Sequence, residues 1–253
     1  MFKKIILASM LAVVSSFADE DEYKVLEAHK GRVSFGTSYR TYEVRDVNYH
    51  LVDIGVNARY TVIQNLELAL DIPYRVFNYW SGNDDYMVGF GNLSFSAAYQ
   101  FISKMNVFAG VSAPVEDLSN DAWTFNAGLR FSTEINRLID FGALLGVVSA
   151  TKGKDDYVPV VGVADAKLFF NVTPQFTPFV GMTFNFQEQI PVYDSKRLHS
   201  RESIYFGSSV GADYKFNDVV GINATVGLHR YFGLGDLPSF FIADAAFHVF
   251  VYF

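Results

Sequence analysis

Histidine and cysteine are the first residues to consider for catalysis or metal binding. The chain has no cysteine and five histidines, which are His29, His50, His199, His229 and His248. His229 and His248 are expected to point the same way from neighbouring strands, about 5 residues or ~16 Å apart in height at ~3.3 Å per residue. Two ligands that far apart cannot share a metal ion, so the sequence predicts no metal site and no cofactor.

A lipid-hydrolysing site would need serine, histidine and asparagine side by side on one wall. His50 has no outward serine and asparagine at its level, and His199 with Ser200 falls in a loop. The glycine-containing stretches at residues 89–92 and 232–236 match no phosphate-binding loop, because such a loop needs a following helix. We therefore expect no catalytic residues and no enzymatic activity.

Charged residues at alternating positions are stronger candidates for function. They share one face of the expected strands and have mixed signs: Arg40, Asp53, Arg59, Glu67, Asp71, Arg75, Arg130, Asp140, Asp165, Lys167, Asp213, Lys215 and Asp244. If the strands cross a membrane, such charges must face water or a partner. Two interpretations satisfy this. The face lines a wet pore whose charges tune selectivity, or it forms a lattice of cross-strand ion pairs that stiffens or plugs a narrow barrel.

Strands are the elements that must position these residues, because alternation with a period of two recurs along the chain. In residues 50–60, HLVDIGVNARY, apolar side chains alternate with Asp53, Gly55, Asn57 and Arg59. An even number of strands, from about 8 upward, is typical of bacterial outer-membrane barrels. About twelve such segments occur, near residues 32–44, 48–62, 66–79, 89–102, 105–115, 121–133, 138–149, 157–171, 176–187, 202–216, 219–231 and 239–253.

The connections between these segments are of two kinds. Five are expected to be tight turns, at Asn65, Ser103-Lys104, Asn136, Thr173-Pro174 and Asn217-Asp218. The others vary more, and acids outnumber bases in them: Asp84, Asp85, Glu116, Asp117, Asp121, Asp155, Asp156, Asp194 and Asp236 against Lys152, Lys154, Lys196, Arg197 and Arg201. Short periplasmic turns and longer extracellular loops are typical of such barrels. The acidic loops could form a cation-favouring mouth, hold divalent bridges to anionic lipid, or simply be solvated.

Aromatic residues gather near both ends of the expected strands. Those near the outer ends are Tyr79, Trp80, Trp123, Tyr157, Tyr231 and Phe241, and those near the inner ends are Tyr99, Phe101, Phe131, Phe170, Tyr214, Phe216 and Phe253. Two belts are expected where a barrel meets the two interfaces of a bilayer. A soluble β-sandwich or lipocalin-like barrel would also alternate, but its strands would typically have about 5–6 residues. The sequence therefore predicts an all-β fold, a transmembrane antiparallel up-and-down β-barrel.

The N-terminal residues have the pattern of an export signal. Residues 1–18, MFKKIILASMLAVVSSFA, contain two lysines, a short apolar run and small residues before a cleavage site after Ala18. Cleavage would leave residues 19–30 as a periplasmic segment and a candidate plug of the lumen, followed by the barrel at residues 31–253. The net charge of −7 argues against a nucleic-acid partner, because binding phosphates requires a basic face.

Part of the inward face is apolar instead of polar. The residues concerned are Val161, Val163, Phe169, Phe179, Phe240, Ile242 and Phe250. They could form a path for an apolar solute, or they could pack against residues 19–30 folded into the barrel. A third interpretation is a register slip of one residue in these strands, which would exchange the two faces.

The last seven residues, FHVFVYF, have an apolar side chain at every second position, at Phe247, Val249, Val251 and Phe253. We expect these side chains to face lipid. The strand must pair with the first one near residues 33–39, because an open edge cannot remain in hydrocarbon. A terminal aromatic on alternating apolar residues also resembles the recognition signal of the barrel-assembly machinery. We expect that machinery, outer-membrane lipids and lipopolysaccharide as partners.

Two stretches resemble the MetA-pathway-of-phenol-degradation family of outer-membrane transporters. That family shows a tyrosine, a short turn, a strand with Leu-Glu-Leu and Pro-Tyr, and a glycine-containing strand ending in tyrosine. The matching residues are Tyr60, Asn65, Leu66, Glu67, Leu68, Ile72, Pro73, Tyr74, Gly89, Gly91, Leu93, Ser94 and Tyr99. Asn92 stands where the family has aspartate, and residues 211–233 are similar to its last hairpins. The resemblance implies uptake of small solutes, with aromatic compounds among the candidates, and transfers no binding residues.

The sequence as a whole predicts a passive channel or transporter for small solutes, including aromatic or hydrophobic compounds, in the cell outer membrane. The alternative is a non-conducting structural or surface-interaction barrel. In that case side chains and residues 19–30 would fill the lumen.

Overall fold

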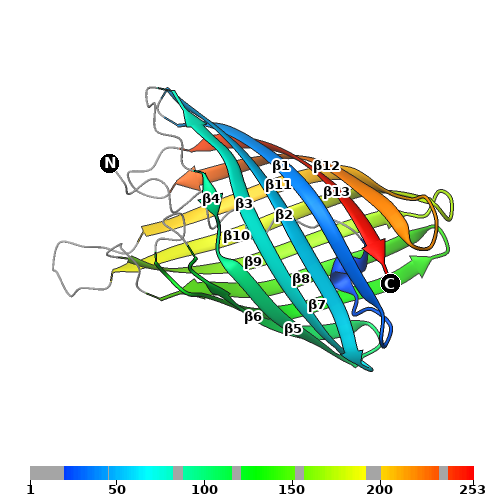
Figure 1. The fold of residues 1–253 in the computed structure, drawn as a ribbon. Coiled ribbons are helices and arrows are strands. Elements are labelled where there is room, and N and C mark those ends of the chain that lie inside the picture. Colours follow the sequence, from blue (N-terminus) through cyan, green and yellow to red (C-terminus); the bar gives the residue numbers. More distant parts are fainter. Residues whose placement is uncertain are drawn as a thin grey trace.

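The computed structural model describes residues 20–44, 46–81, 88–115, 121–151, 157–191, 201–233 and 239–253. They form a closed antiparallel β-barrel, preceded by a short 3-10 helix, η2, at Glu20–Tyr23 (Figure 1). The strands are β1 (Gly31–Val44), β2 (Val47–Ile63), β3 (Leu66–Trp80), β4 (Gly89–Phe90), β5 (Leu93–Ile102), β6 (Met105–Ala113), β7 (Thr124–Asn136), β8 (Ile139–Ala150), β9 (Tyr157–Phe170), β10 (Phe176–Pro191), β11 (Arg201–Lys215), β12 (Val220–Gly233) and β13 (Phe240–Tyr252). The predicted signal peptide lies outside the described residues, among which no helix is long and apolar enough to cross a membrane.

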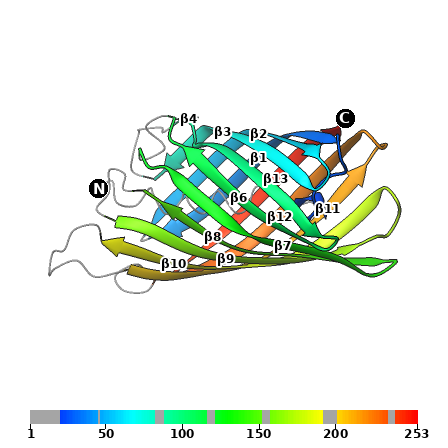
Figure 2. The ribbon, with the colours of Figure 1, turned by 90° about the horizontal axis from the view of Figure 1, so that it is seen from below.

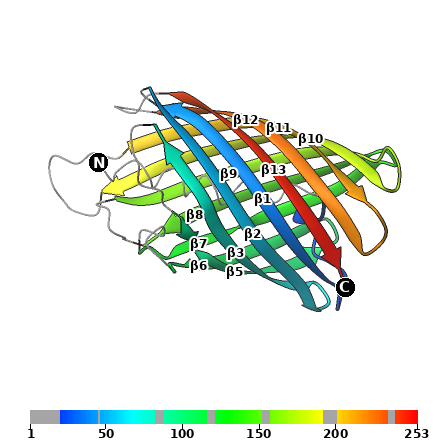
Figure 3. The same ribbon diagram turned by 45° about the horizontal axis from the view of Figure 1, so that its top comes forward.

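The first and last long strands close the barrel. β1 pairs with β13 from Arg32↔Tyr252 to Tyr42↔Ile242, and the other strands follow one another in chain order around the wall (Figure 2; Figure 3). This confirms the predicted pairing of the last strand with residues 33–39. Closure matters because a backbone group left unpaired in hydrocarbon costs several kcal/mol.

The strand predicted at residues 89–102 is interrupted. The sheet has 13 strands, and β4 among them has 2 residues, so twelve longer strands cross the barrel as predicted. β4 pairs with Tyr74 and Arg75, whereas β5 pairs with β3 only up to Asp71. Pro73 lies between these two ladders and has no amide hydrogen to donate. Its carbonyl oxygen instead accepts a hydrogen bond from Gly91 N at 2.9 Å, so the prediction of one unbroken strand was wrong here.

The tight turns gather at one end of the barrel, together with η2 and the C-terminus (Figure 1). Asn217 Oδ1 accepts a hydrogen bond from Val220 N at 2.8 Å, and Thr173 Oγ1 accepts one from Phe176 N at 3.0 Å. Asn65 adopts a left-handed φ of 69°, which asparagine tolerates better than most residues. Short polar side chains therefore reverse the chain at this end within a few residues.

Most of the charged loop residues at the opposite end lie outside the described residues. They are Asp84, Asp85, Glu116, Asp117, Asp155, Asp156, Asp194, Asp236, Lys152, Lys154, Lys196 and Arg197, and the side chains of Trp80, Tyr157 and Arg201 are outside as well. Asp121 is described and has a left-handed φ of 54° just before β7. The acidic character of this end stays a prediction from the sequence.

The two faces of the wall have opposite character. Outward side chains are large and apolar. Val180, Val210 and Val226 are register neighbours at one level, with 44%, 53% and 54% of their surfaces exposed. A soluble monomer rarely exposes a contiguous apolar patch above a few hundred Å². This wall is therefore suited to lipid, and the fold is a transmembrane antiparallel β-barrel.

Both aromatic belts are present on the outer face of the barrel, and among the described side chains Tyr231 departs from the prediction. Exposed rings are found near the outer end at Trp123 and Phe241, and near the inner end at Tyr99, Phe101, Tyr214, Phe216 and Phe253. Tyr231, however, is 1% exposed and packs inside the lumen against Phe240, with ring centroids 4.8 Å apart. Its assignment to the outer belt was wrong, because it shares the parity of inward His229.

The end of the chain seals the barrel against the start of β1. Gly31 N donates to the Phe253 carbonyl oxygen at 2.8 Å, and Phe253 N donates to the Gly31 carbonyl oxygen at 3.0 Å. A Cβ at Gly31 would lie 2.4 Å from Phe253 Cζ, so glycine makes room for this ring. The candidate assembly signal has the outward parity expected of it, at Phe247, Val249, Val251 and Phe253.

An arginine at Val210 should prevent insertion of the barrel, because a base on the lipid-facing midplane costs about 2–4 kcal/mol. An arginine at Ser209 should be tolerated, because this side chain lies on the lumen face beside Gly181 and Lys167. Refolding into lipid bilayers, followed by heat-modifiable gel mobility, measures the yield of each variant. Equal yields for Val210→Arg and Ser209→Arg would contradict the assignment of the two faces.

Candidate functional site

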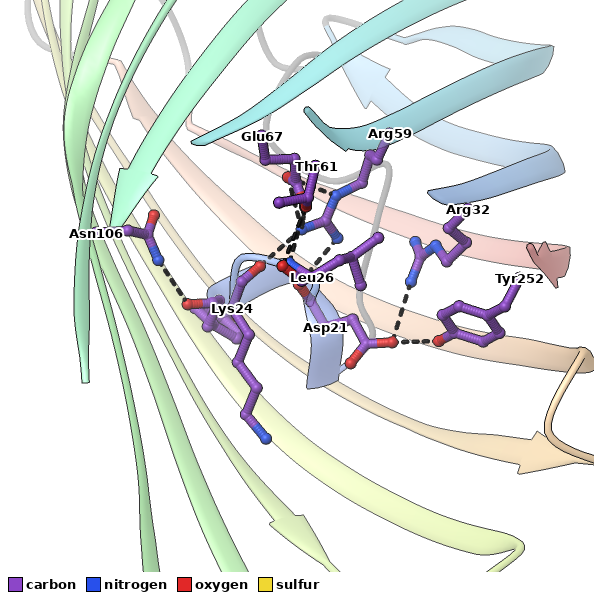
Figure 4. Close-up of polar contacts among 10 residues, drawn as sticks. Asp21, Lys24, Leu26, Arg32, Arg59, Thr61, Glu67, Asn106 and Tyr252 are labelled. Carbon is purple, nitrogen blue, oxygen red and sulfur yellow. Dashed lines mark hydrogen bonds and ion pairs between the residues drawn. The ribbon is translucent and has the colours of Figure 1, made fainter. Parts of the chain in front are cut away.

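Residues 20–30 lie inside the barrel at the end with the tight turns, where Arg59 of β2 holds them (Figure 4). Arg59 Nη1 donates to the Asp21 carbonyl oxygen at 2.8 Å, and Nη2 donates to the Lys24 carbonyl oxygen at 2.7 Å. Its Nη2 also lies 2.8 Å from Glu67 Oε1 of β3, and both side chains of this pair are buried. Two predicted lumen residues thus meet and bind the segment.

Glu67 and Thr61 extend this contact along the segment. Leu26 N donates to Glu67 Oε2 at 3.1 Å, and Thr61 Oγ1 donates to the Leu26 carbonyl oxygen at 3.0 Å. The backbone continues the pairing, because His29 N donates to the Thr61 carbonyl oxygen at 2.9 Å and Thr61 N donates to that of Lys30 at 3.0 Å. The chain between η2 and β1 is therefore fixed to the end of β2.

Asp21 fixes the segment to the seam between β1 and β13. Its carboxylate accepts a hydrogen bond from the Tyr252 hydroxyl, and its Oδ2 lies 3.8 Å from Arg32 Nη1. Burial acts to raise the pKa of Asp21, but the charge of Arg32 and the hydrogen bond from Tyr252, with two further bases, outweigh it. The pKa of this carboxyl therefore lies below its usual value, and Asp21 is charged at neutral pH.

Glu22 and Tyr23 reach the wall formed by β9. Lys167 Nζ lies 2.9 Å from Glu22 Oε2 and 3.7 Å from Asp165 Oδ1, and the Tyr23 hydroxyl donates to Asp165. Burial raises the pKa of Glu22 even though Lys167 acts against it. Because the pKa of Asp21 is lowered, protonating Asp21 at low pH weakens the binding of residues 20–30 to the wall. Because the pKa of Glu22 is raised, protonating Glu22 favours that binding. The two effects on docking oppose each other.

The apolar part of the inward face packs partly against this segment. Tyr23, Phe169 and Phe179 form one buried cluster, with centroid distances of 6.1 Å for the first two rings and 5.6 Å for the last two. A Cβ at Gly142 would lie 2.3 Å from Tyr23 Cδ2, so the glycine gives the ring its space. A register slip is excluded, because the remaining residues of this group also lie on the inward face: Val161, Val163, Phe240, Ile242 and Phe250.

Other predicted lumen residues pair across neighbouring strands. Arg75 Nε lies 2.7 Å from Asp53 Oδ1, and His229 Nε2 lies 2.8 Å from Asp244 Oδ2. Arg40 is buried, and Lys215 Nζ lies 6.0 Å from the centroid of the Tyr252 ring. The remaining acids accept hydrogen bonds from asparagine, in the pairs Asp213–Asn223, Asp140–Asn171 and Asp71–Asn57.

Aromatic rings line the lumen toward the outer end, on β1, β2, β11, β12 and β13. The contacting rings, with their centroid distances, are Tyr42–Tyr49 at 4.8 Å, Tyr42–Phe240 at 5.5 Å, Tyr231–Phe240 at 4.8 Å and Tyr205–His229 at 5.0 Å. We call these six side chains the aromatic wall. It presents ring faces and edges to this part of the lumen.

A cavity of about 190 Å³ adjoins residues 20–30 inside the barrel, and Glu22 is part of its lining. Arginine and apolar side chains share its walls, among them Arg32, Arg59, Arg130, Phe108 and Val163. The guanidinium carbon of Arg130 lies 4.6 Å from the centroid of the Phe108 ring. The cavity is therefore suited to a small solute that has both a polar and an apolar part.

Sequence reasoning missed several inward residues that bind the segment. Arg32 is 2% exposed and has the parity of Arg40 on the same strand, so the alternation could have identified it. Asn106 donates through Nδ2 to the Tyr23 carbonyl oxygen at 3.0 Å. Neutral side chains such as Asn106 and Thr61 carry no signal in the sequence beyond their parity.

His229 and His248 do not come together. His229 is in register with Ile242, and His248 is in register with Asn223, so they are six residues apart along β12 (229 − 223). Among the described residues, no group of three or more histidines and acids could hold a metal ion. His50 lies on the outer face, where its Nδ1 is 2.8 Å from the Tyr39 hydroxyl.

The fold places this chain in the class of transmembrane antiparallel β-barrels, and solved structures of outer-membrane barrels are similar to it. The crystal structure of the COG4313 outer membrane channel from Pseudomonas putida F1 is similar to it, with a TM-score of 0.74, 13% identity, and coverage of 94% of this chain and 100% of that chain. The translocator domain of autotransporter NalP from Neisseria meningitidis is similar with a TM-score of 0.53, 12% identity, and coverage of 97% and 94%. At these identities the likeness shows the fold alone. No family model and no curated protein matches the sequence.

Replacing Arg59 with methionine should release residues 20–30 from the lumen. The change breaks the buried pair with Glu67, and removing one partner of such a pair costs about 3–5 kcal/mol. We expect faster amide hydrogen exchange in residues 20–30, measured by mass spectrometry on the barrel in detergent. Arg75→Met is the matched control, because it breaks the pair with Asp53 away from the segment. Equal protection of the segment in both variants would show that Arg59 does not hold it.

Proposed function

We propose that this protein is an outer-membrane channel or transporter through which small solutes diffuse, and that aromatic or hydrophobic compounds are among them. The observation that carries the proposal is the inner surface. The aromatic wall lies toward the outer end, and the cavity of about 190 Å³ lies toward the inner end. Conduction requires contacts that are favourable enough for entry and weak enough for exit, which successive ring faces can provide.

We further propose that the barrel is exported by the signal at residues 1–18 and stands with the tight turns in the periplasm. The exposed apolar wall supports a lipid environment, with lipopolysaccharide and outer-membrane lipids as neighbours. The mechanism is passive diffusion down a gradient, without a cofactor or a catalytic group.

Residues 19–30 act in this proposal as a plug on the periplasmic side. The contacts of Asp21 with the β1–β13 seam, and of Glu22 and Tyr23 with β9, support this role. A solute then passes when the segment shifts or leaves. The resemblance to the MetA-pathway-of-phenol-degradation family is a further reason to propose aromatic solutes.

A non-conducting barrel is the second candidate. The burial of Tyr23, which is 1% exposed between Phe169 and Phe179, favours it. If the segment never leaves this position, the inner end stays filled and the outer loops carry the function.

Single-channel recording in planar bilayers separates the two candidates. The variant lacking residues 19–30 should conduct more than the mature chain, because the deletion empties the inner end of the lumen. Arg59→Met should change conductance in the same direction, and Arg75→Met should not. Silent traces from the deletion variant, shown to be folded by its heat-modifiable mobility, would refute the channel and leave the non-conducting barrel.

Replacing Phe253 with alanine should reduce assembly more than it alters transport. The terminal aromatic is the proposed signal for the assembly machinery, and the change keeps the backbone bonds to Gly31. Phe241→Ala is the control, because Phe241 is an exposed aromatic at the other end of β13. The amount of folded barrel in isolated outer membranes gives the result. An equal loss in both variants would argue against a signal specific to Phe253.

A further inference from the structure

Arg130 of β7 lines the cavity beside residues 20–30, and no acid among the described residues lies within salt-bridge distance of it. Within the described part of the chain it forms no salt bridge, and its Nε is shielded from solvent without a hydrogen-bond acceptor. The two acids that line the same cavity are engaged by other bases. Glu67 is paired with Arg59 at 2.8 Å, and Glu22 is paired with Lys167 at 2.9 Å. Because a buried charge without a partner is costly, this arrangement favours an additional anion.

An aromatic ring, and not an acid, holds Arg130 in place. Its Cζ lies 4.6 Å from the centroid of the Phe108 ring, which is cation–π geometry. Phe108 in turn lies against two glycines. A Cβ at Gly128 would be 2.8 Å from Phe108 Cε1, and a Cβ at Gly146 would be 3.4 Å from Phe108 Cζ. The glycines leave room for the ring, and a stacked guanidinium keeps the N–H donors at its edge free for an anion.

The rest of the cavity indicates which anion fits. Leu144, Val148 and Val163 line it together with Arg130. A carboxylate matches the planar fork of arginine, while these apolar side chains match a hydrocarbon or aromatic body. The other two arginines of the cavity already face acids, because Arg59 pairs with Glu67 and Arg32 lies 3.8 Å from Asp21. Arg130 is thus the arginine of this cavity that lacks a salt-bridge partner among the described residues, and a single guanidinium suits a ligand with a single negative charge.

We propose that this cavity binds small organic monocarboxylates with an apolar or aromatic body. The carboxylate lies on Arg130, and the body lies against Leu144, Val148 and Val163. This inference rests on the proposed function, because it places the site on the route of a solute through the lumen. It narrows the class of solute from small apolar compounds in general to carboxylic acids.

Benzoate is the probe, and benzyl alcohol is its neutral counterpart of similar size. Isothermal titration of the mature barrel in detergent should show benzoate binding, with benzyl alcohol binding about tenfold more weakly or worse, because it lacks the charge-assisted bonds. Arg130→Gln should weaken benzoate binding about tenfold or more, and Arg130→Lys should restore part of it. Arg230→Gln should leave binding unchanged, because Arg230 is exposed on the outer face between the rings of Phe232 and Phe241.

Each variant is first shown to be folded by its heat-modifiable mobility. Three results would overturn the site. They are equal benzoate binding by the original chain and Arg130→Gln, equal binding of benzoate and benzyl alcohol, and no benzoate binding by the folded original chain. Conductance is recorded separately. A barrel that binds benzoate through Arg130 but does not conduct would support the site and refute the channel. A barrel that conducts but does not bind benzoate would support the channel and refute the site.

Discussion

The structure depends on the requirement that strands in lipid pair every backbone N–H and C=O group within the sheet. Here the requirement is met by the pairing of β1 with β13, which continues to the hydrogen bonds between Gly31 and Phe253. Once the sheet is closed, its register cannot slide, because a slip of one residue would turn the apolar face inward. Closure therefore fixes which side chains face lipid and which face the lumen.

A closed barrel of this size brings its inward side chains close together, and the lumen divides into two parts. Toward the inner end, residues 20–30 supply the partners that buried charges need. Arg59 is satisfied by Glu67 together with two carbonyl oxygens of the segment. Toward the outer end the lumen is lined by the aromatic wall. The segment thus stabilises the charges that hold it, and its removal has an electrostatic cost as well as a steric effect.

An ion-pair lattice and an internal cavity are therefore both present in the described lumen. Pairs such as Arg75–Asp53 neutralise charge along the wall, while the cavity beside residues 20–30 keeps a space of about 190 Å³. Arg130 stands apart from the lattice because Phe108 holds it instead of an acid. The described lumen therefore combines neutralised charge pairs with a base that an aromatic ring holds in place.

The sequence by itself determined the strands and their two faces, because alternation is a local property that each segment carries. Two predictions from the sequence were wrong. Tyr231 was assigned to the outer aromatic belt because it lies near a strand end, although its parity is inward. The strand opposite Pro73 was predicted to be unbroken, although proline has no amide hydrogen to donate. The tertiary structure decided which inward residues meet. The Tyr23 hydroxyl donates a hydrogen bond to Asp165, 142 residues away in the sequence, and the Tyr252 hydroxyl donates one to Asp21, 231 residues away. Such contacts form only because the barrel is closed and the N-terminal segment lies inside it. Strand parity predicts which face of the wall a charged side chain is on, but it does not predict which residue that side chain contacts.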